Sequence, residues 1–219
     1  MITYTGAVFN NGPIARLLDL CVASQEPGAA PLEDELVRFC RSIQNSAAAA
    51  WATPPATVAS LLDLVAEQLE QGPACDVPIG FTERLAEAAE TTSGPAHLRM
   101  LAGLIRLIMR GALPDFQELE MSSWEAGMKF ERIRQFWWWA DSGEFDDYLQ
   151  GLREGMESEH PDWCRQEWSL LAAELQQALL IFSSRQQFDR ALKDIVPSAS
   201  PEVFRDILRT IHTHFAEQH

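Results

Sequence analysis

The chain has 219 residues, of which 47% are hydrophobic and 22% are charged, a composition typical of folded globular proteins and not of disordered ones. Its 32 acidic and 17 basic residues give a formal net charge of -15, which argues against nucleic acid as a direct ligand because phosphate contacts need a basic face. The same charge is compatible with a basic protein partner and with solubility alone.

The first half of the chain shows helical periodicity, interrupted by proline and glycine. A short extended arm is expected from Ile2 to Phe9, before the turn signal Asn10-Asn11-Gly12. Pro13 suits the first turn of a helix. Helices are expected at 13–24, 31–51, 56–72, 81–92 and 96–111. The last of these is apolar on most sides, which predicts a central position.

The second half continues this pattern. We expect a helix from about Pro114 or Ser122 to Ala140, and a weaker one through Met156. Pro161 is expected in the first turn of the next helix, and Ser200 is expected to cap the last one. The remaining helices are expected at 162–182, 185–196 and 202–218.

These elements predict an all-α protein, a multi-helix bundle of about eight to ten helices with a possible extended N-terminal arm. We expect one domain over residues 1–219, with a possible sub-bundle boundary near residues 72–80. The expected core comprises Leu17, Leu36, Phe39, Leu61, Leu64, Leu101, Leu104, Ile105, Ile133, Trp137, Leu171, Leu175, Leu179 and Phe204.

The sequence also carries signals about compartment. Its four cysteines include no CxxC pair and predict no zinc or redox motif, so we expect reduced, packed thiols and a cytoplasmic protein. The N-terminus lacks the features of a signal peptide, and the most apolar segment, 98–109, is too short to span a bilayer. Arginine outnumbers lysine 15 to 2, which is typical of a bacterial source with a GC-rich genome.

One stretch, RQFWWWAD at 134–141, places four aromatic residues in a row, which cannot share a single helical face. A helix over 121–140 would have two apolar stripes, with Phe136 and Trp138 toward its polar flanks. One stripe holds Phe130, Ile133, Trp137 and Ala140, and the opposite one holds Met121, Trp124, Met128 and Trp139. Either this helix lies between two layers of the bundle, or one stripe is exposed and binds another molecule.

An acidic segment begins where the aromatic run stops. From Asp141 to Asp162 there are eight carboxylates against Arg153 alone, a net charge of -7. Aromatic surface beside concentrated negative charge suits a basic, amphipathic protein partner, whereas the simpler interpretation is a solvated helix face. The candidate partner-binding residues are Trp124, Trp138, Trp139, Glu144, Asp147, Glu154 and Glu157.

Catalytic and metal motifs are weak. The Glu-x-x-His spacing of di-iron bundles occurs once, at Glu157 to His160, and His212, His214 and His219 are typical of an ordinary helix terminus. There is no GxSxG, P-loop, GxGxxG or HExxH motif. We therefore expect no metal and no cofactor, although distant residues could still assemble a catalytic site.

The leading hypothesis is a non-catalytic acidic helical protein of the chaperone, immunity or adaptor type, which binds a basic protein through the aromatic stripe and the acidic helix. The alternative is an enzyme or small-molecule binder with a Trp-lined pocket between helices. Convex, solvent-facing rings of Trp138 and Trp139 would favour the partner, and an enclosed cavity would favour the ligand. The sequence leaves the oligomeric state and the partner's identity open.

Overall fold

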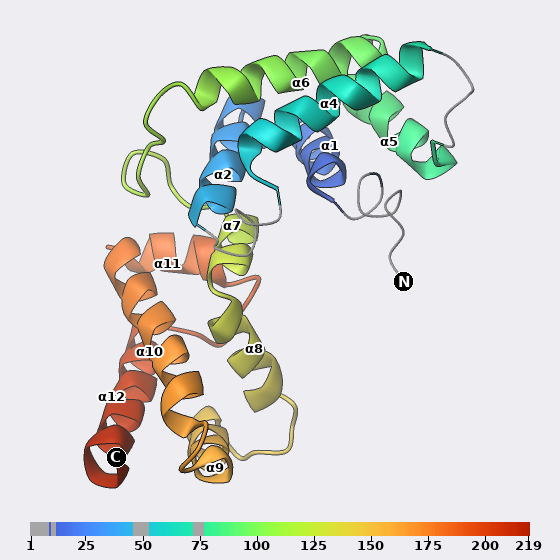
Figure 1. Cartoon of the computed structure of the whole chain (residues 1–219). Coiled ribbons are helices and arrows are strands. Elements are labelled where there is room, and N and C mark those ends of the chain that lie inside the picture. Colours follow the sequence, from blue (N-terminus) through green and yellow to red (C-terminus); the bar gives the residue numbers. More distant parts are fainter. Residues whose placement is uncertain (1–8, 10–11, 46–52, 72–76) are drawn as a thin grey trace. The chain divides into compact units, whose positions relative to one another are not determined.

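The computed structural model describes residues 9, 12–45, 53–71 and 77–219 (Figure 1). These residues form 11 helices and no strand, which confirms the all-α class and slightly exceeds the predicted eight to ten helices. The expected arm at 2–9 lies outside the described residues except for Phe9, whose ring packs edge-on against Phe81. No described helix combines the length and the apolar character needed to cross a membrane.

The chain divides into two compact units, residues 1–115 and 116–219. The boundary that we expected near 72–80 falls largely on residues 72–76, which lie outside the described residues. A single domain over the whole chain therefore stays a prediction, and each unit is described by itself below.

The first unit contains α1 (Pro13–Ser24), α2 (Leu32–Asn45), α4 (Pro55–Glu70), α5 (Ile79–Ala89) and α6 (Gly94–Ile108). Helices α4 and α6 pack side by side (Figure 1). They run antiparallel, because Arg99 near the start of α6 pairs with Glu70 at the end of α4. About two helical turns further along α6, Arg106 Nη2 lies 2.5 Å from Asp63 Oδ2 of α4.

The core of the first unit follows the predicted apolar stripes, with two corrections. Leu17, Leu36, Phe39, Leu101 and Ile105 are buried, and Leu61 and Leu104 are half-buried. Leu64 is 44% exposed and not a core residue, because the buried face of α4 runs through Val58, Leu62 and Val65. Helix α6 is not central either, since Met100 and Leu107 on it are exposed.

The second unit contains α7 (Ser123–Lys129), α8 (Glu131–Ala140), α9 (Tyr148–Glu159), α10 (Cys164–Ile181), α11 (Arg185–Leu192) and α12 (Pro201–Gln218). Helix α10 packs against α8, α9 and α12, and α11 packs against α7. The predicted core residues of this unit are buried, except that Leu179 is half-buried: Ile133, Trp137, Leu171, Leu175 and Phe204.

The helix expected to run unbroken to Ala140 is interrupted at Phe130, where φ is -105° and ψ is 59°. The Phe130 ring is fully buried against Phe182, with ring centroids 6.0 Å apart. The new helix α8 gains a cap from α10, because Glu174 Oε2 accepts a hydrogen bond from the Ile133 N–H at 3.0 Å. Packing of one aromatic ring thus divides the predicted helix in two, and this division raises the helix count.

The other predicted helix ends agree in part with the structure. Pro13 stands in the first turn of α1, and Ser200 caps α12 by accepting from the Val203 N–H at 3.2 Å, both as predicted. Helix α10 begins at Cys164, so Pro161 lies in the turn before it and not in its first turn.

Candidate functional site

The run of aromatic residues is placed by α8, whose buried face holds Ile133, Phe136 and Trp137. These positions follow the i, i+3, i+4 spacing of one helical face. The prediction that Phe136 points to a polar flank is wrong, because Phe136 is buried. Helices α9 and α10 both pack against α8. The Phe136 ring meets those of Trp137 and Trp168 edge-on. The buried Trp137 indole donates a hydrogen bond to Ser198 Oγ at 2.9 Å.

Trp138 is the one residue of the aromatic run 136–139 whose side chain lies mainly in solvent. It is 84% exposed, the highest value among the large apolar side chains that the structure describes as exposed. It borders an open groove of about 450 Å³. The groove is lined by Arg134, Trp137, Trp138, Trp139, Asp141, Ser142, Ile195 and Pro197, and we call it the Trp138 groove. Its lining is mostly apolar and includes charges of both signs.

Trp139 is half-buried between α8 and α9. Its ring centroid lies 4.7 Å from that of Phe145, and it also contacts Phe136 and Trp168. Gly155 of α9 is needed for this packing, because a Cβ there would lie 2.6 Å from Trp168 Cζ2 and 2.9 Å from Trp139 Cη2. Trp139 is therefore a half-buried ring that contributes to packing, unlike Trp138.

A second and smaller cavity, of about 200 Å³, opens on the other side of Trp139. We call it the aromatic–carboxylate pocket, and it is lined by Arg132, Gln135, Phe136, Trp139, Glu159, Glu167, Trp168 and Leu171. Arg132 Nη1 pairs with Glu167 Oε2 at 2.7 Å. Within this pocket the Trp168 Nε1 and Glu159 Oε2 atoms are buried without a hydrogen bond of normal geometry.

Electrostatics distinguish Glu159 from the other carboxylates of the segment. Burial and the nearby charge of Glu167 raise the pKa of Glu159, and the Trp168 indole offsets this only in part. The surroundings therefore disfavour an unpaired negative charge on Glu159 relative to a carboxylate in water. The pocket combines three aromatic rings with two carboxylates, and Arg132 already pairs with Glu167. Aromatic rings beside the remaining carboxylate, Glu159, suit a cationic group.

The predicted acidic residues occupy different places. Asp147 caps α9, since its Oδ1 accepts hydrogen bonds from the N–H groups of Leu149 and Gln150 at 2.8 Å. Glu144 is exposed in the turn before α9. Glu154 is exposed on α9 and accepts a hydrogen bond from Gln150 Nε2 at 2.8 Å.

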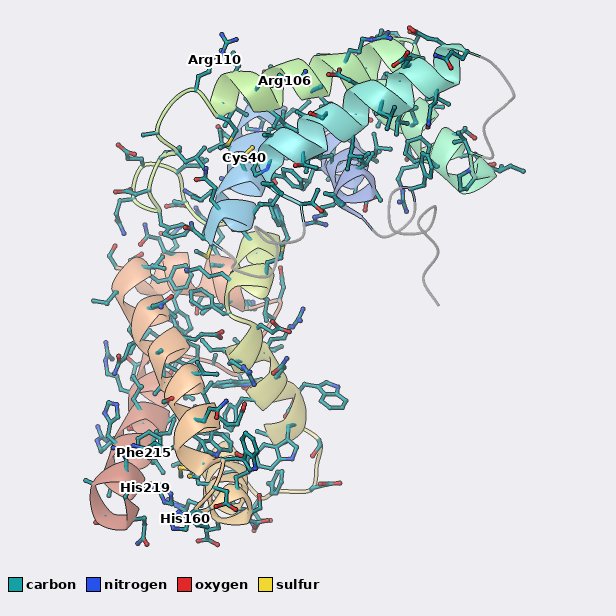
Figure 2. The ribbon with its side chains drawn as sticks, in the orientation of Figure 1. Cys40, Arg106, Arg110, His160, Phe215 and His219 are labelled. Carbon is teal, nitrogen blue, oxygen red and sulfur yellow. The ribbon has the colours of Figure 1, made fainter. Side chains whose placement is uncertain are left out.

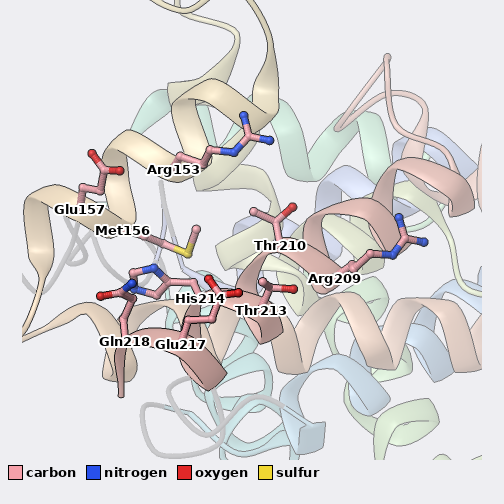
Figure 3. A pocket seen from close by; sticks show the side chains of 9 residues that line it. All are labelled: Arg153, Met156, Glu157, Arg209, Thr210, Thr213, His214, Glu217 and Gln218. Atoms are coloured by element: carbon pink, nitrogen blue, oxygen red, sulfur yellow. The ribbon is translucent and has the colours of Figure 1, made fainter.

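Glu157 lies apart from the tryptophans, in a groove of about 350 Å³ that α9 forms with α12 (Figure 3). Arg153 lines the same groove, and in the close-up Met156 lies between α9 and His214 of α12. Glu154 is three residues before Glu157 and therefore lies about 60° from it around α9, so the two carboxylates are neighbours on one exposed side of the helix. Glu157 lines the groove with α12 and Glu154 does not, and both stay candidate contacts for a partner.

Trp124 is half-buried on α7, beyond the break at Phe130, and it does not line the Trp138 groove. Of the predicted site residues, Trp138 and Trp139 come together at one groove. Glu144, Asp147 and Glu154 belong to the neighbouring turn and helix, and each stays a candidate contact for a partner.

The structure also brings together side chains that the sequence analysis did not connect. His160, Cys164, His214 and His219 form one cluster at the ends of α9, α10 and α12. The sequence signal is a pair of spacings, His-x₃-Cys and His-x₄-His, which resemble the ligand spacing of zinc sites. Burial and the charge of Glu159 raise the pKa of the Cys164 thiol.

The other described cysteines offer no reactive thiol. Cys21 and Cys40 are buried and free, and burial raises the pKa of each to about 12. At neutral pH both remain protonated, so they behave as small apolar side chains. Cys75 lies outside the described residues.

Comparisons with known proteins add no relative. No protein-family model matches the chain, and no match is found among curated proteins or among solved structures.

Proposed function

We propose that the chain is a non-catalytic cytoplasmic protein that binds a basic protein partner, in the manner of a chaperone, immunity protein or adaptor. The observation that carries the proposal is the exposed indole of Trp138 beside its groove. A tryptophan is costly to leave in water, and interface hot spots are enriched in this residue. Trp138 is the anchor of the proposed interface.

Charge supports the proposed chemistry of the partner. The turn and helix that follow α8 expose Asp141, Glu144 and Glu154, and Asp141 lines the Trp138 groove. Charge of this kind speeds the encounter with a basic partner, whereas an aromatic anchor that becomes buried on binding slows the partner's release. The chain's net charge of -15 also attracts a basic partner over longer distances and so speeds association further.

The aromatic–carboxylate pocket suggests how such a partner is recognised. Trp139 borders both this pocket and the Trp138 groove. One lysine or arginine of the partner can enter the pocket toward Glu159 while an apolar side chain covers Trp138. In this arrangement the partner's cationic group would be the counter-charge of the half-buried Glu159 carboxylate.

Association kinetics with the partner test this division of roles. Trp138→Ala is expected to weaken binding by about 2 kcal/mol, roughly 30-fold, mainly through faster dissociation. Glu154→Lys is expected to slow association, and added salt should reproduce that effect. Glu157→Lys, three residues further along on the same exposed side of α9, should slow association as well. Equal kinetics for wild type and Trp138→Ala would contradict the proposal.

A second candidate function is favoured by the buried Glu159 and Trp168 atoms that lack good hydrogen bonds. The aromatic–carboxylate pocket could instead hold a small organic cation. Titration with tetramethylammonium, followed by tryptophan fluorescence, separates the two. A saturable change that Glu159→Gln removes and Trp138→Ala retains would favour the small ligand over the protein partner.

A further inference from the structure

Three imidazoles and one thiol converge at one end of the second unit. His160 follows the last residue of α9, Cys164 is the first residue of α10, and His214 and His219 belong to the end of α12. One nitrogen or sulfur atom from each lies within 4.8 Å of all the others. Figure 2 shows His160 and His219 close together at this end, where their ring centroids are 4.7 Å apart.

We propose that these four side chains, His160, Cys164, His214 and His219, bind one zinc ion with three nitrogen ligands and one sulfur ligand. Zinc prefers imidazole nitrogen and thiolate sulfur in a tetrahedral arrangement. Thiolate and imidazole together disfavour calcium and magnesium, which take oxygen ligands. The chemistry of the donor set thus selects the metal.

The distances permit a tetrahedral site with small movements. Atoms within 4.8 Å of one another fit inside a sphere of about 2.9 Å radius, whereas zinc needs about 2.0–2.1 Å to nitrogen and 2.3 Å to sulfur. Each ligand atom therefore moves inward by less than about 1 Å, which side-chain rotation supplies. The Cys164 Sγ and His214 Nε2 atoms are already 3.2 Å apart, close to the edge of about 3.5 Å in a zinc tetrahedron.

The surroundings of the cluster also suit a bound ion. Cys164 is fully buried and His214 is half-buried, so two ligands are held by the fold, while the exposed His160 and His219 leave a path for entry. The three rings contact one another, with His214 and His160 centroids 5.6 Å apart and His214 and His219 centroids 5.5 Å apart. A metal explains why three imidazoles meet around one thiol.

Four protein ligands leave no position for water or substrate, so the site is structural and not catalytic. Its ligands come from three helices that meet at one end of the unit, and the ion links them. This role is independent of the proposed partner binding, because neither the Trp138 groove nor the aromatic–carboxylate pocket includes a ligand.

Metal titration of the full chain tests the proposal. The chain is purified without a histidine tag, stripped with a chelator and titrated with Co²⁺, then with Zn²⁺. We expect one equivalent of Co²⁺ to produce the intense visible bands of tetrahedral cobalt and a thiolate-to-cobalt charge-transfer band, which Zn²⁺ then removes. Cys164→Ser should lose the charge-transfer band, and His214→Ala should lower the Zn²⁺ affinity by about 100-fold or more.

Two further variants keep the test independent of folding. His219→Ala changes an exposed side chain at the end of α12, so its far-ultraviolet circular dichroism should be unchanged while its Zn²⁺ affinity falls. His212→Ala is the matched control, because His212 is exposed on the same helix and faces Gln176. His212→Ala should bind Zn²⁺ like the wild type. Zn²⁺ should raise the midpoint of thermal unfolding of the wild type and of His212→Ala.

Several results would overturn the proposal. One is an octahedral cobalt spectrum without a charge-transfer band. Another is Zn²⁺ binding weaker than about 10 μM, far from the affinity of structural zinc sites. Binding that survives Cys164→Ser and His219→Ala, or that is lost in His212→Ala, would show only non-specific capture by terminal histidines.

Discussion

Replacing Gly155 by alanine tests the packing of the tryptophans against α9. In an open helical position this change stabilises a protein by about 0.5–1 kcal/mol, because alanine has the higher helix propensity. At Gly155 the new Cβ would lie 2.6 Å and 2.9 Å from atoms of the Trp168 and Trp139 rings. Both distances are impossible without movement, and rigid rings in a packed site can move only together with their helices.

The cost of such overpacking is about 1–3 kcal/mol, and the short contact at Gly155 places it toward the upper end. After the gain in helix propensity, we expect Gly155→Ala to destabilise the second unit by about 1–2 kcal/mol. Gly103→Ala is the matched control, since Gly103 lies on α6 and a Cβ there meets nothing within 4 Å. It should stabilise the first unit by about 0.5–1 kcal/mol.

Urea unfolding with two probes separates these effects. Six of the seven tryptophans belong to residues 116–219, so fluorescence reports mainly on the second unit, while circular dichroism reports on both. We expect the fluorescence midpoint to fall in Gly155→Ala and to stay unchanged in Gly103→Ala. If Gly155→Ala stabilised the protein as much as Gly103→Ala, the close approach of α9 to the tryptophans would be refuted.

Three further predictions use the same unfolding assay. Trp138→Ala should change the free energy of unfolding by less than about 0.5 kcal/mol, whereas Trp139→Ala should lower it by about 2 kcal/mol or more; equal losses would place both rings in the core. Glu174→Ala should lower the free energy of unfolding by about 1–2 kcal/mol because α8 loses its cap, and Glu174→Gln should lower it less. If neither variant lost stability, the cap would not contribute to the stability of the fold. Burial lowers the pKa of His97 in the folded protein. The free energy of unfolding is therefore unaffected by His97 titration above about pH 6.5, where the imidazole is neutral in both states, and it falls as the pH drops from there toward the lowered pKa, because the unfolded state then binds the proton first. His97→Leu should remove this part of the pH dependence of the unfolding free energy, and an unchanged pH dependence would contradict the prediction.

Much of the fold could be predicted from the sequence because helical periodicity and breakers act locally. The first-turn position of Pro13, the cap at Ser200 and the buried stripe of Ile133 and Trp137 follow from local residue types and spacing. The break at Phe130 could not be predicted, because it depends on burial of that ring against Phe182 and on the carboxylate of Glu174, which accepts a hydrogen bond from the first turn of α8. These partners lie more than 40 residues away along the chain.

The candidate site was predictable in kind but not in detail. Four adjacent aromatic residues require one to leave the core, and Trp138 does so. Which of the four it would be depends on how α9 and α10 enclose Phe136 and Trp139, and the sequence does not specify that packing. The sequence did not predict the cluster around Cys164, because His214 and His219 lie 50 residues or more beyond Cys164 along the chain, at the end of α12.

The most direct test of the central claim is quantitative capture of proteins from a lysate of the source organism on three immobilised chains. These are the wild type, Trp138→Ala and Trp163→Ala, the last being a control because Trp163 is 61% exposed but does not line the Trp138 groove. The proposal predicts that a basic protein is captured by the wild type and by Trp163→Ala, and is lost with Trp138→Ala. If wild type and Trp138→Ala capture the same proteins in the same amounts, the exposed indole does not bind a partner and the claim is wrong.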